Sequence, residues 1–224
     1  MKLTLVTYAN EKFYQQQNNL IHSVEPHGIF DRIKAYREKD IDEQFKKEHS
    51  HILEQERGGG YWLWKPYFIY TTLCIMKEND VLLYMDCGDG FTADYNTLRN
   101  FLIAKMQKNN ILLTAGGYPN REYTKRDCFI GMGCDEAKYH NKTQLEAGIL
   151  VFKKSTVSMM FVIEWLQFCC DEQLLTDKPN TAGDNLPGFK DHRHDQSILS
   201  LLAIKRGIDS SSDMRNFITC NINT

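Results

Sequence analysis

The stretch DVLLYMDCGD, residues 80–89, decides the fold expected for this chain. Its central residues form a continuous apolar run, which is typical of a parallel strand covered by helices on both faces. The run ends at a carboxylate, Asp86. A second apolar run, residues 3–8, is rich in strand-forming residues and predicts a first buried strand.

Strands and helices are expected to alternate on both sides of this stretch. The patterns predict further strands at 28–36, 111–114 and 147–152, and helices at 13–24, 40–56, 67–77, 95–108, 156–172 and 195–206. Residues 115–145 and 176–193 lack periodicity and are expected to be irregular, as functional loops often are. The alternation predicts an α/β fold with a mostly parallel central sheet flanked by helices, in one domain spanning 1–224.

Composition excludes several classes of protein. The 224 residues are 42% hydrophobic and carry a formal net charge of −2, which excludes a disordered chain and argues against nucleic acid as a partner. No apolar run reaches about 18 residues, so we expect no integral membrane segment. Aromatic residues are abundant, at 12%.

The cysteines and the N-terminal residues favour a cytoplasmic protein. The seven cysteines are irregularly spaced and contain no CxxC pair, which indicates reduced thiols rather than a zinc ribbon. The first apolar run is too short for a signal peptide.

Two carboxylates follow the central strand. Ligands of open α/β sheets bind beyond the carboxyl ends of strands, where Asp86 is expected, and Asp89 follows one residue after Gly88. Carboxylate pairs hold Mg²⁺ or Mn²⁺ and share the ion with substrate phosphates. The alternative is that an acid at a strand end only caps the next turn.

A second candidate, DHRHDQS at 191–197, directly precedes an apolar helix. His192 or His194 could complete a metal site begun by Asp86, whereas Asp195 could be a simple helix N-cap.

Two further segments are of the type that meets phosphate. A Gly-rich turn, 58–60, precedes a helix but has neither GxGxxG nor P-loop spacing. The aromatic residues that follow it, at 61–64, could be core or a flat wall for a base or sugar. Arg126 has the planar fork that suits a diphosphate, or it belongs to a solvated charge run.

Together these stretches resemble small glycosyltransferases of the GT-A fold, found in bacterial capsule and surface-polysaccharide clusters and in some large DNA viruses. The resemblance covers about residues 1–207 and is carried by GGGYWLWKP (58–66), LYMDCGD (83–89), TKRD (124–127), QLEAGILVFK (144–153) and HRHDQSILSLLA (192–203). It implies a GT-A-like single domain, with a Rossmann-like nucleotide-sugar half at about 1–114 and an acceptor half at about 115–224.

The resemblance also implies a divalent ion, Mn²⁺ or Mg²⁺, between the aspartates of a DxD motif and the donor diphosphate. Asp86 matches the first aspartate, but Gly88 stands where the second would be, so Asp89 is a displaced candidate. His192 or His194 is the implied further ligand.

Other residues inherit donor and acceptor roles from the resemblance. Asp195 and Gln196 match a DQ pair beside the donor sugar or the acceptor, and Asp195 or Asp127 would be the base of an inverting reaction. The residues expected on the donor side are Tyr8, Trp64, Lys65, Asp86, Gly88 and Arg126.

The expected function is transfer of a sugar from a nucleotide-sugar donor, a UDP-sugar above all, to a saccharide or glycan acceptor. A sugar nucleotidyltransferase is disfavoured, because residues 7–11 after the first strand lack a Gly-rich basic loop. A non-enzymatic carbohydrate-binding module would explain the aromatic content but neither Asp86 nor HRHDQS.

Overall fold

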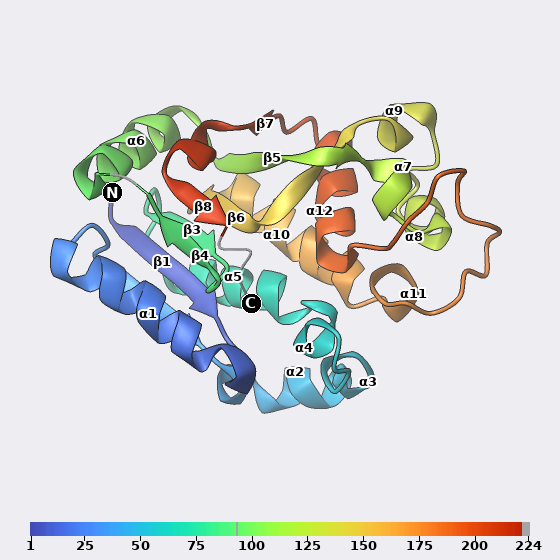
Figure 1. Cartoon of the computed structure of the whole chain (residues 1–224), viewed down its shortest axis with the longest axis horizontal. Coiled ribbons are helices and arrows are strands. Elements are labelled where there is room, and N and C mark those ends of the chain that lie inside the picture. Colours follow the sequence, from blue (N-terminus) through green and yellow to red (C-terminus); the bar gives the residue numbers. More distant parts are fainter. Residues whose placement is uncertain (93, 221–224) are drawn as a thin grey trace.

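A six-stranded sheet in the order β2-β1-β3-β6-β5-β7 forms the centre of the protein (Figure 1). The computed structural model describes residues 1–92 and 94–220. β1 pairs in parallel with β2 and β3, and β5 pairs in parallel with β7, whereas β6 is antiparallel to both β3 and β5. The strands are β1 (Leu3–Tyr8), β2 (Arg32–Tyr36), β3 (Val81–Met85), β5 (Ile111–Pro119), β6 (Thr143–Lys153) and β7 (Ser210–Ser211).

Helices cover both faces of this sheet. Alternate strand residues point to opposite faces, so Leu83 packs with α1 (Tyr14–Val24) and α6 (Tyr95–Lys108), whereas Leu82 packs with the helices of the other face. Those helices are α5 (Trp64–Ile75), α10 (Thr156–Cys169) and α12 (His194–Lys205). The mixed α/β class, with a mostly parallel sheet between helices, is confirmed.

Shorter elements connect these layers. A small antiparallel pair, β4 (Asp89–Phe91) and β8 (Ile218–Cys220), lies in front of the main sheet in Figure 1. The short helices are η1 (Glu11–Phe13), η2 (Glu25–His27), η3 (Glu38–Asp40), α2 (Glu43–Glu48), α3 (Ser50–Leu53), α4 (Gly58–Tyr61), α7 (Asn120–Tyr123), α8 (Arg126–Gly131), α9 (Ala137–His140), α11 (Glu172–Leu175) and η4 (Asp213–Asn216).

Several boundaries differ from the expected ones. The segment 115–145, expected to be irregular, contains the end of β5, three helical turns and the start of β6. Register shifts after Leu113 and after Ala115 interrupt the pairing of these strands, so no two-residue period marks them in the sequence. The expected helix 40–56 is divided into η3, α2 and α3.

No helix in the described part of the chain is both long and apolar enough to span a membrane. The six cysteines whose side chains are described are free thiols, as expected.

A close strand approach at Gly116 generates a test of the β5–β6 pairing. A Cβ at Gly116 would lie 2.4 Å from the backbone oxygen of Gln144, whereas nothing lies within 4 Å of one at Gly117. We expect Gly116→Ala to lower the free energy of unfolding by about 1–3 kcal/mol because the strands must separate. Urea denaturation measures the change. Gly117→Ala is the matched control, and equal effects of the two variants would contradict the close approach.

Candidate active site

A buried lysine joins three elements at the edge of the sheet where β1 and β3 end. Lys65, in the first turn of α5, is 2% exposed, and its Nζ lies 3.4 Å from Asp86 Oδ1 and 3.3 Å from Asp195 Oδ2. The ammonium also donates a hydrogen bond to the backbone oxygen of Ala147 in β6 (3.1 Å). Burial alone lowers the pKa of Lys65, but the two carboxylates outweigh it and raise that pKa, so the lysine stays charged.

Asp195 is the most buried carboxylate of this cluster. It follows His194 at the start of α12 and is 3% exposed. Burial raises the pKa of Asp195 to about 6, with Lys65 opposing the shift and Asp86 adding to it. Asp195 is therefore mostly ionised at neutral pH and protonates only slightly below it.

Asp86 directly follows β3 and divides its two oxygens between different partners. Oδ1 accepts a hydrogen bond from the Tyr84 hydroxyl and faces Lys65. Oδ2 faces Gly148 on the neighbouring strand, where an added Cβ would lie 3.1 Å away. The same Cβ would lie 3.4 Å from Asp89 Oδ2, so both aspartates border one space over Gly148.

This pair of aspartates fits a divalent ion in part. Mg²⁺ is commonly held by one or two carboxylates plus substrate phosphates, which matches two oxygens converging on a glycine. Within residues 1–92 and 94–220, however, no three His, Cys, Asp or Glu side chains gather in a way that could hold a metal ion. The histidine expected as a further ligand is therefore not beside Asp86 and Asp89.

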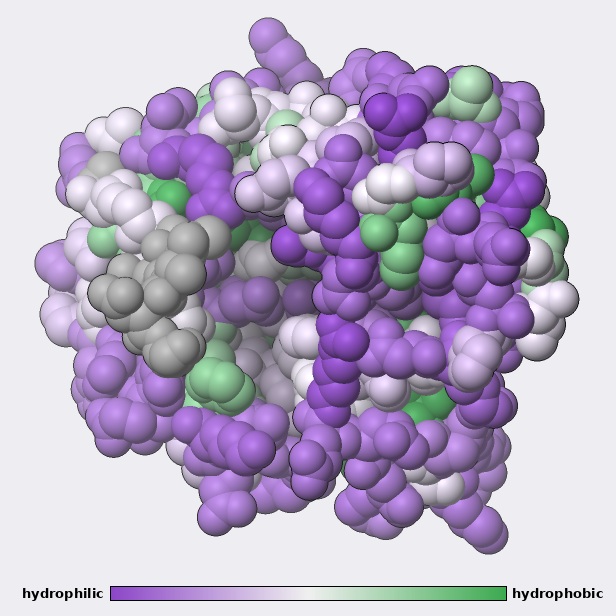
Figure 2. Space-filling view, turned by 45° about the vertical axis from the view of Figure 1, so that its right-hand side comes forward, coloured by the Kyte–Doolittle hydropathy of each residue, from purple (hydrophilic) through white to green (hydrophobic). Residues whose placement is uncertain are grey.

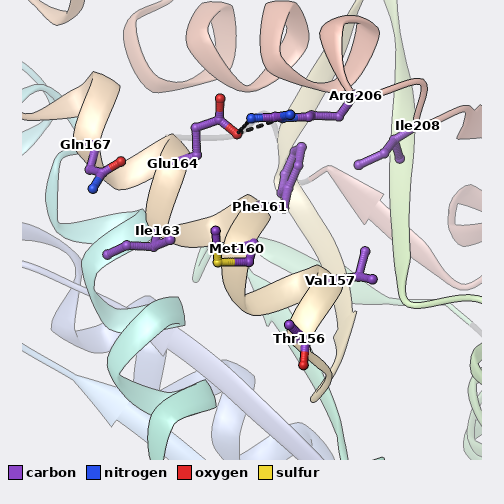
Figure 3. A pocket seen from close by; sticks show the side chains of 9 residues that line it. All are labelled: Thr156, Val157, Met160, Phe161, Ile163, Glu164, Gln167, Arg206 and Ile208. Atoms are coloured by element: carbon purple, nitrogen blue, oxygen red, sulfur yellow. Dashed lines mark hydrogen bonds and ion pairs between the residues drawn. The ribbon is translucent and has the colours of Figure 1, made fainter.

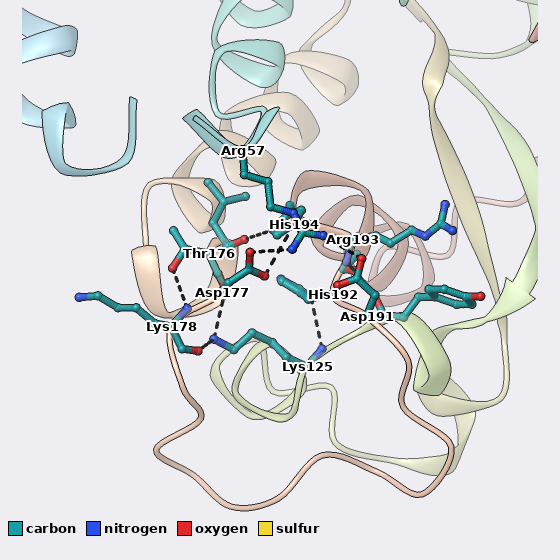
Figure 4. Close-up of polar contacts among 12 residues, drawn as sticks. Arg57, Lys125, Thr176, Asp177, Lys178, Asp191, His192, Arg193 and His194 are labelled. Carbon is teal, nitrogen blue, oxygen red and sulfur yellow. Dashed lines mark hydrogen bonds and ion pairs between the residues drawn. The ribbon is translucent and has the colours of Figure 1, made fainter. Parts of the chain in front are cut away.

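His192 and His194 instead hold the segment around α11 (Figure 4). His192 Nδ1 accepts a hydrogen bond from the Lys125 backbone N–H (3.2 Å), and its Nε2 donates to the Leu174 backbone oxygen (2.9 Å). His194 Nδ1 donates to the Leu175 backbone oxygen (2.8 Å). Burial lowers the pKa of both rings, so they remain neutral. The structure thus gives these histidines a structural role in place of the expected metal ligation.

A pocket of about 430 Å³ opens beside Asp86, at the carboxyl ends of β1 and β3. The Tyr8 and Trp64 rings stack in its wall, with centroids 3.8 Å apart and planes 22° apart. The face drawn in Figure 2 is hollowed near its middle, and hydrophilic residues border the right-hand side of the hollow. The pocket lining is Tyr8, Ala9, Asn10, Lys12, Phe13, Glu56, Gly58, Gly59, Trp62, Trp64, Asp86, Cys87 and Gly88. Four of the residues expected on the donor side therefore share one pocket, and Lys65 Nζ lies 5.7 Å from the centroid of the Trp64 ring.

The Gly-rich segment 58–62, which contains the short element α4, forms one wall of this pocket, and its backbone is a left-handed turn rather than a regular α-helix. Backbone φ is positive at every residue from Gly58 to Trp62, including the two aromatic residues, for which this conformation is costly. Gly60 also approaches Leu53 closely, because a Cβ added at Gly60 would lie 2.7 Å from the Cα of Leu53. The Trp64 indole donates to the Gly58 oxygen (3.0 Å). Backbone strain of this kind is concentrated at functional sites in proteins.

Gln196 lies beside the Lys65 cluster. Its amide nitrogen donates to Gln144 Oε1 (2.9 Å), and its amide oxygen accepts from the Ala147 backbone N–H (3.5 Å). Gln196 thus ties α12 to the strand whose oxygen binds Lys65.

Asp127 and Arg126 lie with the irregular segment 176–193 instead. The Asp127 carboxylate accepts hydrogen bonds from Gln173, from the backbone and hydroxyl of Thr181, and from the Ala182 backbone. The Arg126 backbone N–H donates to Asn185 Oδ1 (2.8 Å), whereas its guanidinium is paired with Asp135 (2.6 Å). Both oxygens of Asp127 accept hydrogen bonds from this part of the chain, so Asp127 anchors the segment. These contacts disfavour the alternative that Asp127 is a catalytic base.

Sequence reasoning missed three residues that shape the site. Tyr84 could have been found, because it lies two residues before Asp86 and so points to the same face of the strand. Finding Gly148 would have required the register between β3 and β6. That register places Gly148 opposite Asp86, whose backbone N–H donates to the Gly148 oxygen. Finding Arg57 would have required knowledge of where the loop 176–193 runs, because its partners Asp177 and Asp191 belong to that loop.

Comparison with solved structures identifies the fold. Mouse xyloside xylosyltransferase 1 aligns with a TM-score of 0.51 and 8% identity, over 94% of this chain and 84% of that one. The fold is that of a GT-A glycosyltransferase. The bifunctional glycosyltransferase WbbM aligns with a TM-score of 0.50 and 10% identity, over 90% of this chain and 37% of that one. No protein-family model and no curated protein matches the chain.

The Lys65 cluster predicts a strong dependence of stability on this one cation. We expect Lys65→Met to lower the free energy of unfolding by about 3–5 kcal/mol, because Asp86 and Asp195 lose their shared counter-charge. Adding Asp195→Asn to that variant is expected to restore part of the loss, and urea denaturation at pH 7 measures both. Lys47→Met, at an exposed position of α2, is the control. If the stability losses of Lys65→Met and Asp195→Asn simply add in the double variant, the ion pair between Lys65 and Asp195 is contradicted.

The Asp127 anchor predicts a dependence on pH. Burial raises the pKa of Asp127, but its hydrogen bonds outweigh burial and lower that pKa below its usual value. The stabilisation is then fully present above about pH 4 and is lost as pH falls through the lowered pKa.

We therefore expect Asp127→Asn to cost about 1–3 kcal/mol at pH 7, with a smaller difference from the parent at pH 3. Urea titrations at both pH values measure this, and cleavage within 176–193 by a protease should quicken. Asp184→Asn, at an exposed position of the same segment, is the control. A difference that grows toward acid pH would be evidence against the anchor.

Proposed function

We propose that the protein is a glycosyltransferase that moves a sugar from a nucleoside diphosphate donor, UDP-linked above all, to a hydroxyl of a saccharide or glycan. The observation that carries this proposal is the position of Asp86. It lies at the carboxyl end of β3, held by Lys65 on one side and open to Asp89 and the pocket on the other. That edge is where open α/β sheets bind nucleotides.

The nucleoside would lie against the stacked rings. Tyr8 and Trp64 supply a flat apolar surface for a base, and a volume of about 430 Å³ is within the usual range for ligand pockets. Gly88 and Gly59 lie on the same pocket, where the absence of a Cβ lets the backbone approach a ligand closely.

The diphosphate would lie over the two aspartates. Asp86 and Asp89 would hold Mn²⁺ or Mg²⁺ there, and such an ion neutralises the charge of a leaving nucleoside diphosphate as a Lewis acid. Lys65 and the Tyr84 hydroxyl fix Asp86 Oδ1 and so direct Oδ2 toward Gly148. Partners behind a metal ligand commonly set its orientation in this way.

Asp195 would act next to the transferred sugar. With a pKa of about 6 it is the carboxylate best matched to proton transfer near neutrality. In an inverting reaction it would receive the proton of the acceptor hydroxyl. In a retaining reaction it would bind a hydroxyl of the donor sugar, with Gln196 holding α12 against β6. The ion pair with Lys65 would hold the Asp195 carboxylate in place in both cases.

The proposal predicts that Asp86→Asn loses metal-dependent nucleotide binding. We expect UDP affinity in the presence of Mn²⁺ to fall by about 10–100-fold, as measured by isothermal titration. Release of UDP from a panel of UDP-sugars should fall at least as much. Asp209→Asn removes an exposed carboxylate distant from the pocket and serves as the control.

Two results would contradict the proposal. One is that UDP fails to bind with or without Mn²⁺. The other is that Asp86→Asn leaves UDP binding unchanged. Release of pyrophosphate from a nucleoside triphosphate and a sugar phosphate would favour a nucleotidyltransferase, and binding of sugar alone would favour a carbohydrate-binding module.

A further inference from the structure

The edge of the sheet opposite the pocket carries a cluster of lysines. β1, β3 and β5 begin at this edge, and β6 ends there. Backbone hydrogen bonds from Val81 to Lys2, from Lys154 to Asp80 and from Lys153 to Asn110 hold the corresponding segments side by side. The cluster, here called the basic edge, comprises Lys2, Lys77, Lys108, Lys153 and Lys154.

The charge of the basic edge is not balanced locally. Within the part of the chain that the structure describes, none of its five lysines forms an ion pair. Asp80 is 8% exposed, and its carboxylate accepts a hydrogen bond from the Lys2 backbone. Asp80 and the exposed Glu78 together offset two of the five charges. The edge therefore presents an excess of positive charge to solvent.

Large apolar side chains lie exposed beside this edge. α5 ends and α10 begins there, and the two helices pack against each other. Ile75 at the end of α5 is 64% exposed, and Val157 and Met160 on α10 are 56% and 63% exposed. Figure 3 shows Val157 and Met160 on a groove of about 630 Å³ that continues along α10 toward Arg206 and Ile208.

We propose that the basic edge, together with Ile75, Val157 and Met160, binds the surface of an anionic lipid bilayer. Lysines near a membrane are attracted to anionic headgroups, and exposed apolar side chains enter the boundary of the acyl region. A nucleic acid would account for the lysines alone. A second copy of this chain related by a two-fold axis would place like charges together.

The geometry leaves the pocket accessible in the bound protein. The pocket lies at the carboxyl ends of β1 and β3, and the basic edge lies where these parallel strands begin. The pocket would therefore face away from the lipid. Binding to the bilayer needs neither nucleotide nor metal, so it is tested independently of the proposed reaction.

The experiment is co-sedimentation of the full chain with vesicles. Phosphatidylcholine vesicles are compared with vesicles that also contain about 30% phosphatidylglycerol, at low and high salt. We expect binding only to the anionic vesicles, and less of it at high salt because salt screens the attraction. Lys77→Glu/Lys154→Glu should lower the partition coefficient at least tenfold, because each lysine contributes on the order of a fivefold factor.

Two further variants separate the proposal from its alternatives. Lys46→Glu/Lys47→Glu makes the same charge change on α2, away from the basic edge, and should leave binding within about twofold of the parent. Ile75→Ser/Met160→Ser keeps the charge and should lower binding several-fold. Circular dichroism verifies that each variant is folded.

The proposal is overturned if neutral vesicles bind equally well or if the α2 variant loses as much as the basic-edge variant. It is also overturned if Ile75→Ser/Met160→Ser binds like the parent. Tight binding of duplex DNA without vesicle binding would indicate a nucleic acid partner instead. A dimer that the basic-edge variants abolish would indicate a second copy of the chain.

Discussion

The structure depends on one buried cation, Lys65, held between Asp86 and Asp195. An ammonium removed from water is stable only if its charge and its hydrogen-bond donors find partners, and here two carboxylates and the Ala147 oxygen supply them. These groups come from α5, β3, β6 and α12, so the contact fixes one face of the sheet against two helices. It also orients Asp86 toward the pocket. The fold and the site thus share a single electrostatic constraint.

Local signals were sufficient for the elements nearest this contact. The continuous apolar run at 81–85 marked β3 correctly, because a strand covered on both faces has no polar side to alternate with. The helical spacing of Leu98, Phe101, Leu102 and Met106 marked α6, and all of them are buried except Phe101, which is half-buried. The position of a carboxylate at the end of β3 followed from the same reasoning.

Local sequence patterns could not predict contacts with residues far away in the chain. The density of acid–base groups at 191–197 indicated chemistry, but the rings of His192 and His194 meet backbone groups of Lys125 and of α11 that only the folded chain brings near. Asp127 finds its donors about fifty residues further along the chain. A side chain's type limits what it can do, and its tertiary neighbours decide which of those roles it takes.

The left-handed turn at 58–62 connects the pocket to the segment 176–193. One side of the turn lines the pocket through Gly58 and Gly59. Arg57, directly before the turn, binds Asp177 and Asp191 of the 176–193 segment at 2.8 Å each. Trp62, which also lines the pocket, stacks on His194 at the start of α12. A substitution that displaces the turn would therefore disturb both the pocket wall and the ion pairs of Asp177 and Asp191.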